Sequence, residues 1–122
     1  MVEVICDTNF LIHLATKRIK NFSNLETEIG SIQFIVPDIV IHELKKLGSN
    51  EKKQKLIPPT LNFIKNLKKV SITGEFADEA LIDYVKLHGG IIGTLDKELK
   101  EKIKSSGGSI MSLSNDCVVL ES

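Results

Sequence analysis

The chain has 122 residues, the length of one ordinary domain, so we expect a single domain over residues 1–122. Hydrophobic residues make up 42% and charged residues 26% of the sequence, which excludes a disordered or fibrous protein. Sixteen basic and sixteen acidic side chains cancel, so any polyanionic partner must be bound by a local group of charges rather than by the overall field.

Predicted strands and helices alternate along the chain. Short apolar runs predict strands, apolar residues spaced three or four apart predict helices, and Pro or Gly residues mark the ends. In chain order, the predicted elements are a strand over residues 2–6, a helix from residue 10, a strand over 33–36, a helix over 38–47 capped by Asp38, a helix from 58 to about 69, a strand over 70–72, a helix over 76–88, a strand over 91–95, a helix over 97–104 and a strand over 109–113. This alternation indicates an α/β fold with helices on both faces of a parallel sheet of about five strands.

The cysteines and the apolar runs indicate where the protein resides. Cys6 and Cys117 lack the spacing of a metal site or of a disulfide-rich secreted domain. The N-terminus enters a strand directly, and no apolar run approaches the roughly 18 residues that a membrane span requires. We therefore expect a cytoplasmic protein with no membrane association.

Two aspartates directly follow predicted strands. Asp7 follows the first strand and Asp96 the fourth. Ligands of such sheets bind outside the carboxyl ends of the strands, so the two carboxylates would project from one edge if their strands are neighbours. Taken singly, each aspartate is better explained as a helix cap.

Glu43 is the least expected charge in the chain. On the helix over 38–47 it falls within the apolar arc that contains Ile39 and Leu44. An isolated charge in the interior costs several kcal/mol, so an inward carboxylate must be neutralised, paired or coordinated. Glu43 is therefore predicted to be half of an ion pair or a metal ligand.

A fourth acid comes from the helix over 76–88, which begins with an Asp-Glu pair. Asp78 lies at the margin of the apolar face and is assigned to the cleft, whereas Glu79 lies on the opposite stripe and is assigned to solvent. A helix start displaced by two residues would exchange the two assignments. As a lone residue, Asp78 is also explained as a first-turn charge that favours the helix dipole.

Together, four acids at one edge of one sheet would repel each other unless cations lay between them. Carboxylate oxygens suit Mg²⁺ or Mn²⁺ rather than zinc, and two such ions about 4 Å apart can activate water and stabilise the leaving oxygen in phosphodiester hydrolysis. Polar neighbours would orient a ligand or a water, or serve only as caps and turn residues. The predicted catalytic and metal-binding residues are Asp7, Glu43, Asp78 and Asp96. The predicted supporting residues are Thr8, Asn9 and Thr94.

Lysines are concentrated in the middle of the chain, where acids are few. Such a stretch could face the phosphates of a nucleic acid, or it could be the solvated faces of two helices. The residues are Lys45, Lys46, Lys52, Lys53, Lys55, Lys65, Lys68 and Lys69.

Four short motifs occur in order over nearly the whole chain. They are Asp-Thr-Asn at 7–9, the glutamate at 43 in the helix that begins Pro-Asp, Ala-Asp-Glu-Ala-Leu at 77–81 and Gly-Thr-Leu-Asp-Lys-Glu-Leu at 93–99. No single motif is specific, but the ordered set resembles the PIN domain family. Leu95 stands where many members have a polar residue, which weakens that motif but keeps the acid in place.

The resemblance implies a three-layer αβα fold, Mg²⁺- or Mn²⁺-dependent endoribonuclease activity on RNA, and frequent homodimers. It implies the same four acids, with Glu79 as the alternative third acid. One branch consists of VapC-type toxins silenced by a small antitoxin, and another processes ribosomal RNA precursors; the motifs at 77–81 and 94–99 are more similar to the processing branch, and the choice stays open. The alternative function is a non-catalytic PIN-like module that binds RNA or protein, which the presence of all four acids disfavours.

Overall fold

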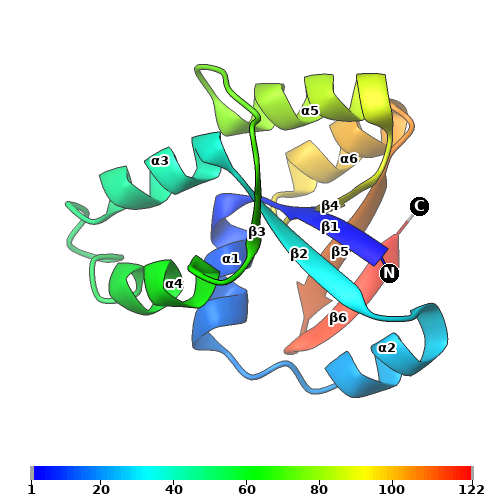
Figure 1. The fold of residues 1–122 in the computed structure, drawn as a ribbon, viewed down its shortest axis with the longest axis horizontal. Coiled ribbons are helices and arrows are strands. Elements are labelled where there is room, and N and C mark those ends of the chain that lie inside the picture. Colours follow the sequence, from blue (N-terminus) through cyan, green and yellow to red (C-terminus); the bar gives the residue numbers. More distant parts are fainter. Residues whose placement is uncertain (1, 122) are drawn as a thin grey trace.

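A six-stranded sheet lies between helices in the computed structural model, which describes residues 2–121 (Figure 1). The strand order is β3-β2-β1-β4-β5-β6, in which β1 to β5 run parallel and β6 is antiparallel to β5. The elements in chain order are β1 (Val2–Cys6), α1 (Thr8–Thr16), α2 (Phe22–Ile29), β2 (Ile32–Pro37), α3 (Asp38–Leu47), α4 (Ile57–Ile64), β3 (Lys68–Val70), α5 (Ala77–His88), β4 (Ile91–Gly93), α6 (Lys97–Ser105), β5 (Ser109–Ser114) and β6 (Cys117–Glu121).

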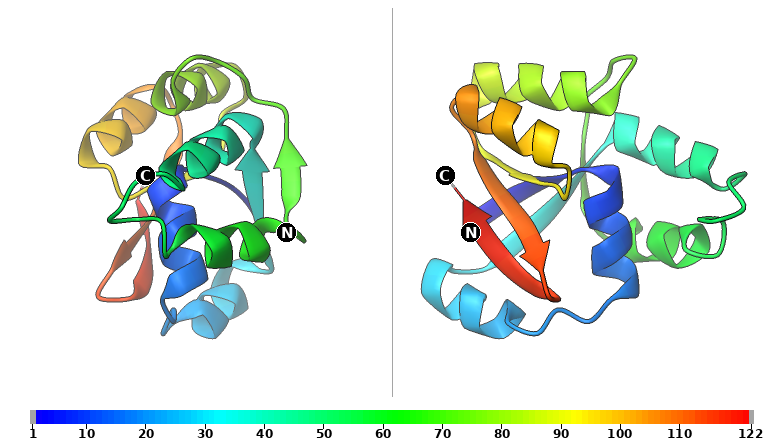
Figure 2. Two further views of the ribbon diagram at one scale, coloured as in Figure 1. Left: turned by 90° about the vertical axis from the view of Figure 1, so that its left-hand side faces the viewer. Right: turned by 180° about the vertical axis from the view of Figure 1, so that it is seen from behind.

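The helices form two layers around the sheet. α5 and α6 pack together on one side, α1 and α4 pack together on the other, and α2 lies beside β6 (Figures 1 and 2). α3 follows β2 at the carboxyl end of the parallel strands and contacts both α1 and α5. The predicted α/β fold with five parallel strands is therefore confirmed, with one antiparallel strand added at the edge.

The central strands are buried because their residues are apolar on both faces. Val4 and Cys6 of β1, Val36 of β2 and Ile92 of β4 have no exposed surface. Such uninterrupted apolar runs are typical of parallel strands covered by helices on both sides. β1 and β4 are direct neighbours, with Cys6 opposite Gly93, so the condition that places Asp7 and Asp96 at one edge of the sheet is met.

The segment after α4 differs from the prediction. α4 ends at Ile64 rather than near Lys69, and the following strand covers 68–70 rather than 70–72. The Lys69 ammonium donates to backbone carbonyls at the end of α4, including those of Ile64 and Lys65, the latter at 2.9 Å. A lysine that satisfies the last carbonyls of a helix closes it, which explains the early end.

Two elements were not predicted, α2 and β6. The turn between β5 and β6 contains Asn115 and Asp116 with φ of 53° and 61°, as in the two-residue turns that favour Asn and Asp. The Asn21 side chain, just before α2, accepts from the Val118 amide at 2.7 Å and donates to the Val118 carbonyl at 3.0 Å. The C-terminal hairpin is thus tied to the segment between α1 and α2.

The helices are short, and α5 is the longest of those described, with 12 residues. Between residues 2 and 121, no helix has the length and apolar character needed to cross a membrane. α1 begins at Thr8 rather than Phe10, and Asp38 is the first residue of α3 rather than its cap. Differences of one or two residues at a helix start are usual, but they matter here because the predicted site lies at helix starts.

Candidate active site

Asp7 lies where the chain leaves β1 and enters α1. Its backbone amide donates to the Gly93 carbonyl of β4 at 2.8 Å, which extends the pairing of the two strands by one residue. Its Oδ2 accepts a hydrogen bond from the Thr94 hydroxyl at 3.1 Å. The Asp7 carboxylate is therefore held between two adjacent strands of the sheet.

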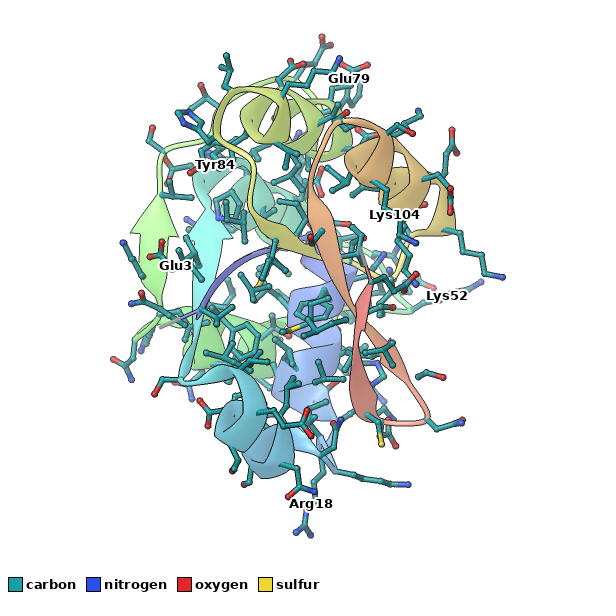
Figure 3. All side chains as sticks on the ribbon, turned by 90° about the vertical axis from the view of Figure 1, so that its right-hand side faces the viewer. Glu3, Arg18, Lys52, Glu79, Tyr84 and Lys104 are labelled. Atoms are coloured by element: carbon teal, nitrogen blue, oxygen red, sulfur yellow. The ribbon has the colours of Figure 1, made fainter. Side chains whose placement is uncertain are left out.

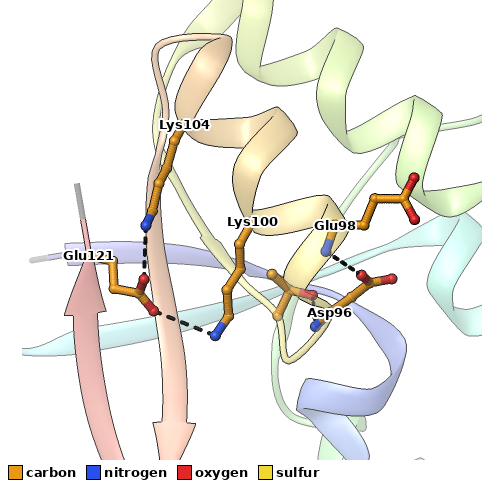
Figure 4. Close-up of polar contacts among 6 residues, drawn as sticks. Asp96, Glu98, Lys100, Lys104 and Glu121 are labelled. Atoms are coloured by element: carbon orange, nitrogen blue, oxygen red, sulfur yellow. Dashed lines mark hydrogen bonds and ion pairs between the residues drawn. The ribbon is translucent and has the colours of Figure 1, made fainter.

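Thr94 connects Asp7 to Asp96. Thr94 is completely buried, and its hydroxyl accepts from the Asp96 amide at 3.1 Å while donating to Asp7. Asp96 caps α6, since its Oδ1 accepts from the backbone amide of Glu98 at 2.9 Å (Figure 4). It also accepts from the Leu99 amide at 3.2 Å. Within residues 2–121, no hydrogen bond reaches Asp96 Oδ2, so the cap leaves one oxygen of this carboxylate for another ligand.

Glu43 extends from α3 towards the start of α1. Its Oε1 accepts a hydrogen bond from the buried Thr8 hydroxyl at 2.6 Å, and the residue is half-buried. The inward direction agrees with its place in the apolar arc of α3. Among the ion pairs of the described chain, none includes Glu43, so its interpretation as half of an ion pair is wrong.

The electrostatics show that three of the four predicted acids lie near one another. Burial raises the pKa of Asp7 above the ordinary value, and the negative charges of Glu43 and Asp96 raise it further, while the Thr94 hydroxyl opposes this shift. No lysine, arginine or histidine of residues 2–121 forms an ion pair with these carboxylates. No ion pair of the described residues therefore compensates their negative charge.

Asp78 is placed differently. It is exposed in the first turn of α5, and its Oδ1 accepts from the Glu79 amide at 3.0 Å. Glu79 is also exposed and lies on the outer side of α5 (Figure 3). In the described part of the chain, no hydrogen bond or ion pair joins Asp78 to the other acids, so its inclusion in the site stays a prediction.

The donor set suits a hard divalent cation, because it consists of carboxylate and hydroxyl oxygens with no basic partner. Over residues 2–121, however, no three His, Cys, Asp or Glu side chains are spaced closely enough to hold a metal ion. This spacing agrees with the effect of Glu43 and Asp96 on the pKa of Asp7, because charges influence a pKa over longer distances than a metal–oxygen bond spans. The structure thus brings together Asp7, Glu43 and Asp96 as neighbours without the spacing of a preformed metal site.

Two of the cavities beside these carboxylates share part of their lining. The first has a volume of about 550 Å³ and contains Glu43 in its lining, together with Thr8, Asn9, Lys46, Asn50 and Lys53. The second has a volume of about 520 Å³ and contains Asp96 in its lining, together with Asn9, Ile12, His13, Leu95 and Lys53. Both volumes are in the range of small-molecule and nucleotide sites.

The lysine-rich stretch is divided by the fold. Lys68 pairs with Glu3 at 3.1 Å, and Lys69 closes the end of α4, so neither faces the carboxylates. Lys46 and Lys53 instead line the first cavity beside Glu43. The phosphate-facing patch therefore stays a prediction, and it now concerns Lys46 and Lys53. The alternative of two solvated helix faces is wrong for most of the stretch, because only Lys45 and Lys46 lie in a helix.

Two structural features of the site were not inferred from the sequence. Gly93 packs under the Phe10 ring, where an added Cβ would lie 2.6 Å from a ring carbon, so only glycine allows α1 to approach β4 this closely. The Lys53 ammonium donates to Asn9 Oδ1 at 2.9 Å, across 44 positions of sequence. A glycine directly before the Thr-Leu-Asp segment was a usable signal for the close packing of Gly93 against Phe10. No local pattern of the sequence marks the hydrogen bond between Lys53 and Asn9.

Comparisons with known proteins place this site in context. A family model described as "PIN like domain" matches residues 4–115. Ribonuclease VapC4 of Methanocaldococcus jannaschii is 32% identical over 117 residues, which cover 91% of this chain and 89% of that protein. The structure of the PIN domain endonuclease Utp24 has a TM-score of 0.74 and 29% identity, covering 95% of this chain and 90% of that one. A domain of a functionally unknown M. jannaschii protein has a TM-score of 0.52 at 20% identity, covers 93% of this chain and 92% of that one, and shares the fold alone.

Proposed function

Because the chain belongs to the PIN-like domain family, we propose that it is a divalent-metal-dependent endoribonuclease whose single domain covers residues 1–122. Nuclease activity in general follows from the family, since one relative is named a ribonuclease and another a PIN domain endonuclease. RNA as the substrate, and Mg²⁺ or Mn²⁺ as the cofactor, are the finer parts of the proposal.

The observation that carries the proposal is the position of Asp7. Its carboxylate is half-buried at the carboxyl edge of the sheet, beside the charges of Glu43 and Asp96, and it forms no ion pair among the described residues. Keeping three neighbouring carboxylates ionised is unfavourable unless a cation compensates them. We assign Asp7, Glu43, Asp78 and Asp96 to the metal-binding and catalytic set.

The protein residues would have distinct tasks in this reaction. Divalent ions, when bound, would supply Lewis acidity and a nucleophilic water at neutral pH. Thr94 orients Asp7 and fixes the backbone of Asp96, and Thr8 orients Glu43. Such hydrogen bonds hold acidic side chains in one rotamer, which reduces the reorganisation needed when a cation and a phosphate enter.

Two expectations about partners stay predictions. A small antitoxin is consistent with the name of the relative VapC4, and a homodimer was expected from the resemblance. We propose the antitoxin only as a partner of the toxin-type variant of this function, and processing of ribosomal RNA precursors as the other variant. Both variants require the same cleavage chemistry.

The test is RNA cleavage by the purified protein with Mn²⁺, with Mg²⁺ and with EDTA, on a panel of labelled single-stranded and hairpin RNAs. We expect cleavage that requires the metal and is lost in Asp7→Asn and Asp96→Asn. Asp83→Asn is the matched control, because Asp83 is an exposed aspartate of α5 that lies outside the assigned set.

The opposite outcome identifies the alternative function. Folded wild-type protein that cleaves no RNA of the panel with either metal, but still binds RNA or a protein, would be a non-catalytic PIN-like module. Cleavage that persists in EDTA, or in both aspartate variants, would show that the assigned carboxylates are not the catalytic centre.

A further inference from the structure

The two cavities beside the carboxylates meet at one contact. Asn9 and Lys53 belong to the linings of both cavities, and the Lys53 ammonium donates to Asn9 Oδ1 at 2.9 Å. Glu43 lies on one side of this contact and Asp96 on the other. The Lys53–Asn9 contact therefore forms a bridge between two hollows that together extend across the candidate active site.

Lys53 carries a charge that is not compensated by an acid. Its partner is a neutral amide oxygen, and no ion pair of residues 2–121 includes it. A phosphate oxygen carries a full negative charge, whereas the Asn9 amide oxygen carries only a partial one, so the ammonium is attracted more strongly to a phosphate. An incoming phosphate would therefore compete well with Asn9 for this ammonium.

The turn that carries Lys53 is compact, so the backbone fixes the point from which the Lys53 side chain extends. The amides of Lys53 and Gln54 donate to the Asn50 carbonyl at 3.1 and 2.8 Å, and the Leu56 amide donates to the Lys53 carbonyl at 2.9 Å. Lys53 is half-buried, whereas its neighbour Lys52 is exposed. Two adjacent lysines of one turn thus have different surroundings, and only Lys53 lies at the cavities.

Each cavity has a lysine of its own for a polyanion, in addition to the shared Lys53 and beside its one carboxylate. Lys46 lines the first cavity and Lys17 the second, although the whole chain has no net charge. Two separate hollows of about 550 and 520 Å³ suit unstacked nucleotides better than a duplex, whose bases are held in a continuous stack.

From these observations, we infer that single-stranded RNA occupies both cavities and that Lys53 releases Asn9 to bind the phosphate between the two nucleotides. This inference rests on the proposed function for its substrate. It assigns Lys53 as a positioning residue, which holds the strand over the carboxylates without taking part in the chemistry.

The experiment measures binding of a fluorescent single-stranded oligoribonucleotide in EDTA, where the proposed metal-dependent cleavage cannot occur. The variants are Lys53→Met, Lys53→Arg and the control Lys52→Met, each measured over a series of salt concentrations. We expect Lys53→Met to weaken binding about tenfold at low salt and to reduce the slope of log K against log salt by about 0.7, the value for one contact to a single strand.

The controls separate phosphate binding from a structural role. Lys53→Arg should retain most of the affinity, Lys52→Met should change it less than about twofold, and a duplex of the same sequence should compete poorly. Asn9→Ala should bind at least as tightly as wild type, because it removes the competitor for Lys53. If Asn9→Ala weakens binding as much as Lys53→Met, the bridge is structural and the inference is wrong.

The remaining outcomes are also decisive. Equal losses in Lys53→Met and Lys52→Met, equal binding of duplex and single strand, or no wild-type binding would each overturn the inference. RNA binding that depends on Lys53 without cleavage in Mn²⁺ would support the inference and contradict the proposed function. Metal-dependent cleavage, with RNA binding that is unchanged in Lys53→Met, would contradict the inference and support the proposed function.

Discussion

The carboxyl ends of β1 and β4 and the start of α5 each contribute predicted acids, but they hold them very differently. Asp7 directly follows β1, Asp96 lies three residues beyond the end of the adjacent strand β4, and both bind the buried Thr94 hydroxyl. Asp78 is exposed, and its recorded hydrogen bond is to the amide of the next residue. Hydrogen-bonded strands fix a side chain by their register, whereas a helix that follows an irregular segment leaves the position of its first turn less constrained.

The largest effect expected from this comparison is on catalysis at the strand ends. Asp7→Asn should lower the cleavage rate by on the order of 10³-fold with saturating Mn²⁺, because it removes the half-buried charge beside both Glu43 and Asp96. Single-turnover cleavage of one RNA measures it. Residual activity within about tenfold of wild type would mean that the strand ends contribute no more to catalysis than the start of α5.

Gly93 tests how tightly the strand ends are packed. Gly93→Ala should lower the free energy of unfolding by about 1–3 kcal/mol, because the new methyl group would overlap the Phe10 ring. Chemical denaturation measures this change. Gly48→Ala is the control, since Gly48 has a helical φ of −59° at the end of α3, and little or no loss is expected there.

Thr94 tests the hydrogen bonds that distinguish the strand ends from the helix start. Thr94→Val keeps the shape but removes the hydroxyl that joins Asp7 and Asp96, and it should weaken Mn²⁺ binding about 10- to 100-fold. The Mn²⁺ concentration dependence of cleavage reports this affinity. Thr60→Val is the matched control, because Thr60 is also buried but donates to the Leu56 carbonyl within α4.

Asp78 and Glu79 test the helix start itself. Asp78→Asn should reduce kcat/KM by about tenfold, less than Asp7→Asn, because Asp78 is exposed. Glu79→Gln should reduce it by less than twofold, because Glu79 lies outside the assigned set. Parallel kinetics of the two variants on one RNA give the answer. A larger loss in Glu79→Gln would exchange their assignments, and no loss in either would limit the site to the strand ends and α3.

The smallest effect concerns stability in the absence of metal. The pKa of Asp7 is raised by burial and by the neighbouring acids, so between the ordinary aspartate pKa and this raised pKa the folded state binds more protons than the unfolded state. Wild-type stability should therefore fall as pH rises through that window. In EDTA at pH 7, Asp7→Asn should be more stable than wild type by about 1 kcal/mol, a typical gain when a destabilising functional charge is removed.

Thermal unfolding with and without metal checks this last expectation. The advantage of Asp7→Asn should disappear well below pH 4, where aspartate is protonated in both states. Mn²⁺ should stabilise wild type more than the variant, because a ligand stabilises the state that binds it. A variant less stable than wild type at neutral pH would contradict the assignment of Asp7 as a half-buried charge without an ion-pair partner.

The sequence by itself determined the fold class and three of the acids that lie close together. These predictions rested on local patterns: apolar strands that alternate with helices, aspartates that follow strands, and a glutamate inside an apolar arc. Such patterns can be recognised in a sequence because the periods of strands and helices are set by backbone geometry. The secondary-structure predictions were wrong where the local pattern is weak or ambiguous. α2 and β6 were missed, although the Asn-Asp turn of residues 115 and 116 was a signal for the hairpin, and α4 was predicted too long.

Only the tertiary structure decided which polar groups meet. Thr94 reaches Asp7 across 87 positions, Lys53 reaches Asn9 across 44, and Thr8 reaches Glu43 across 35. The sequence contained each of these residues, but their distances depend on strand order and on how the turn after α3 folds over α1. These are long-range packing properties, and no local periodicity encodes them.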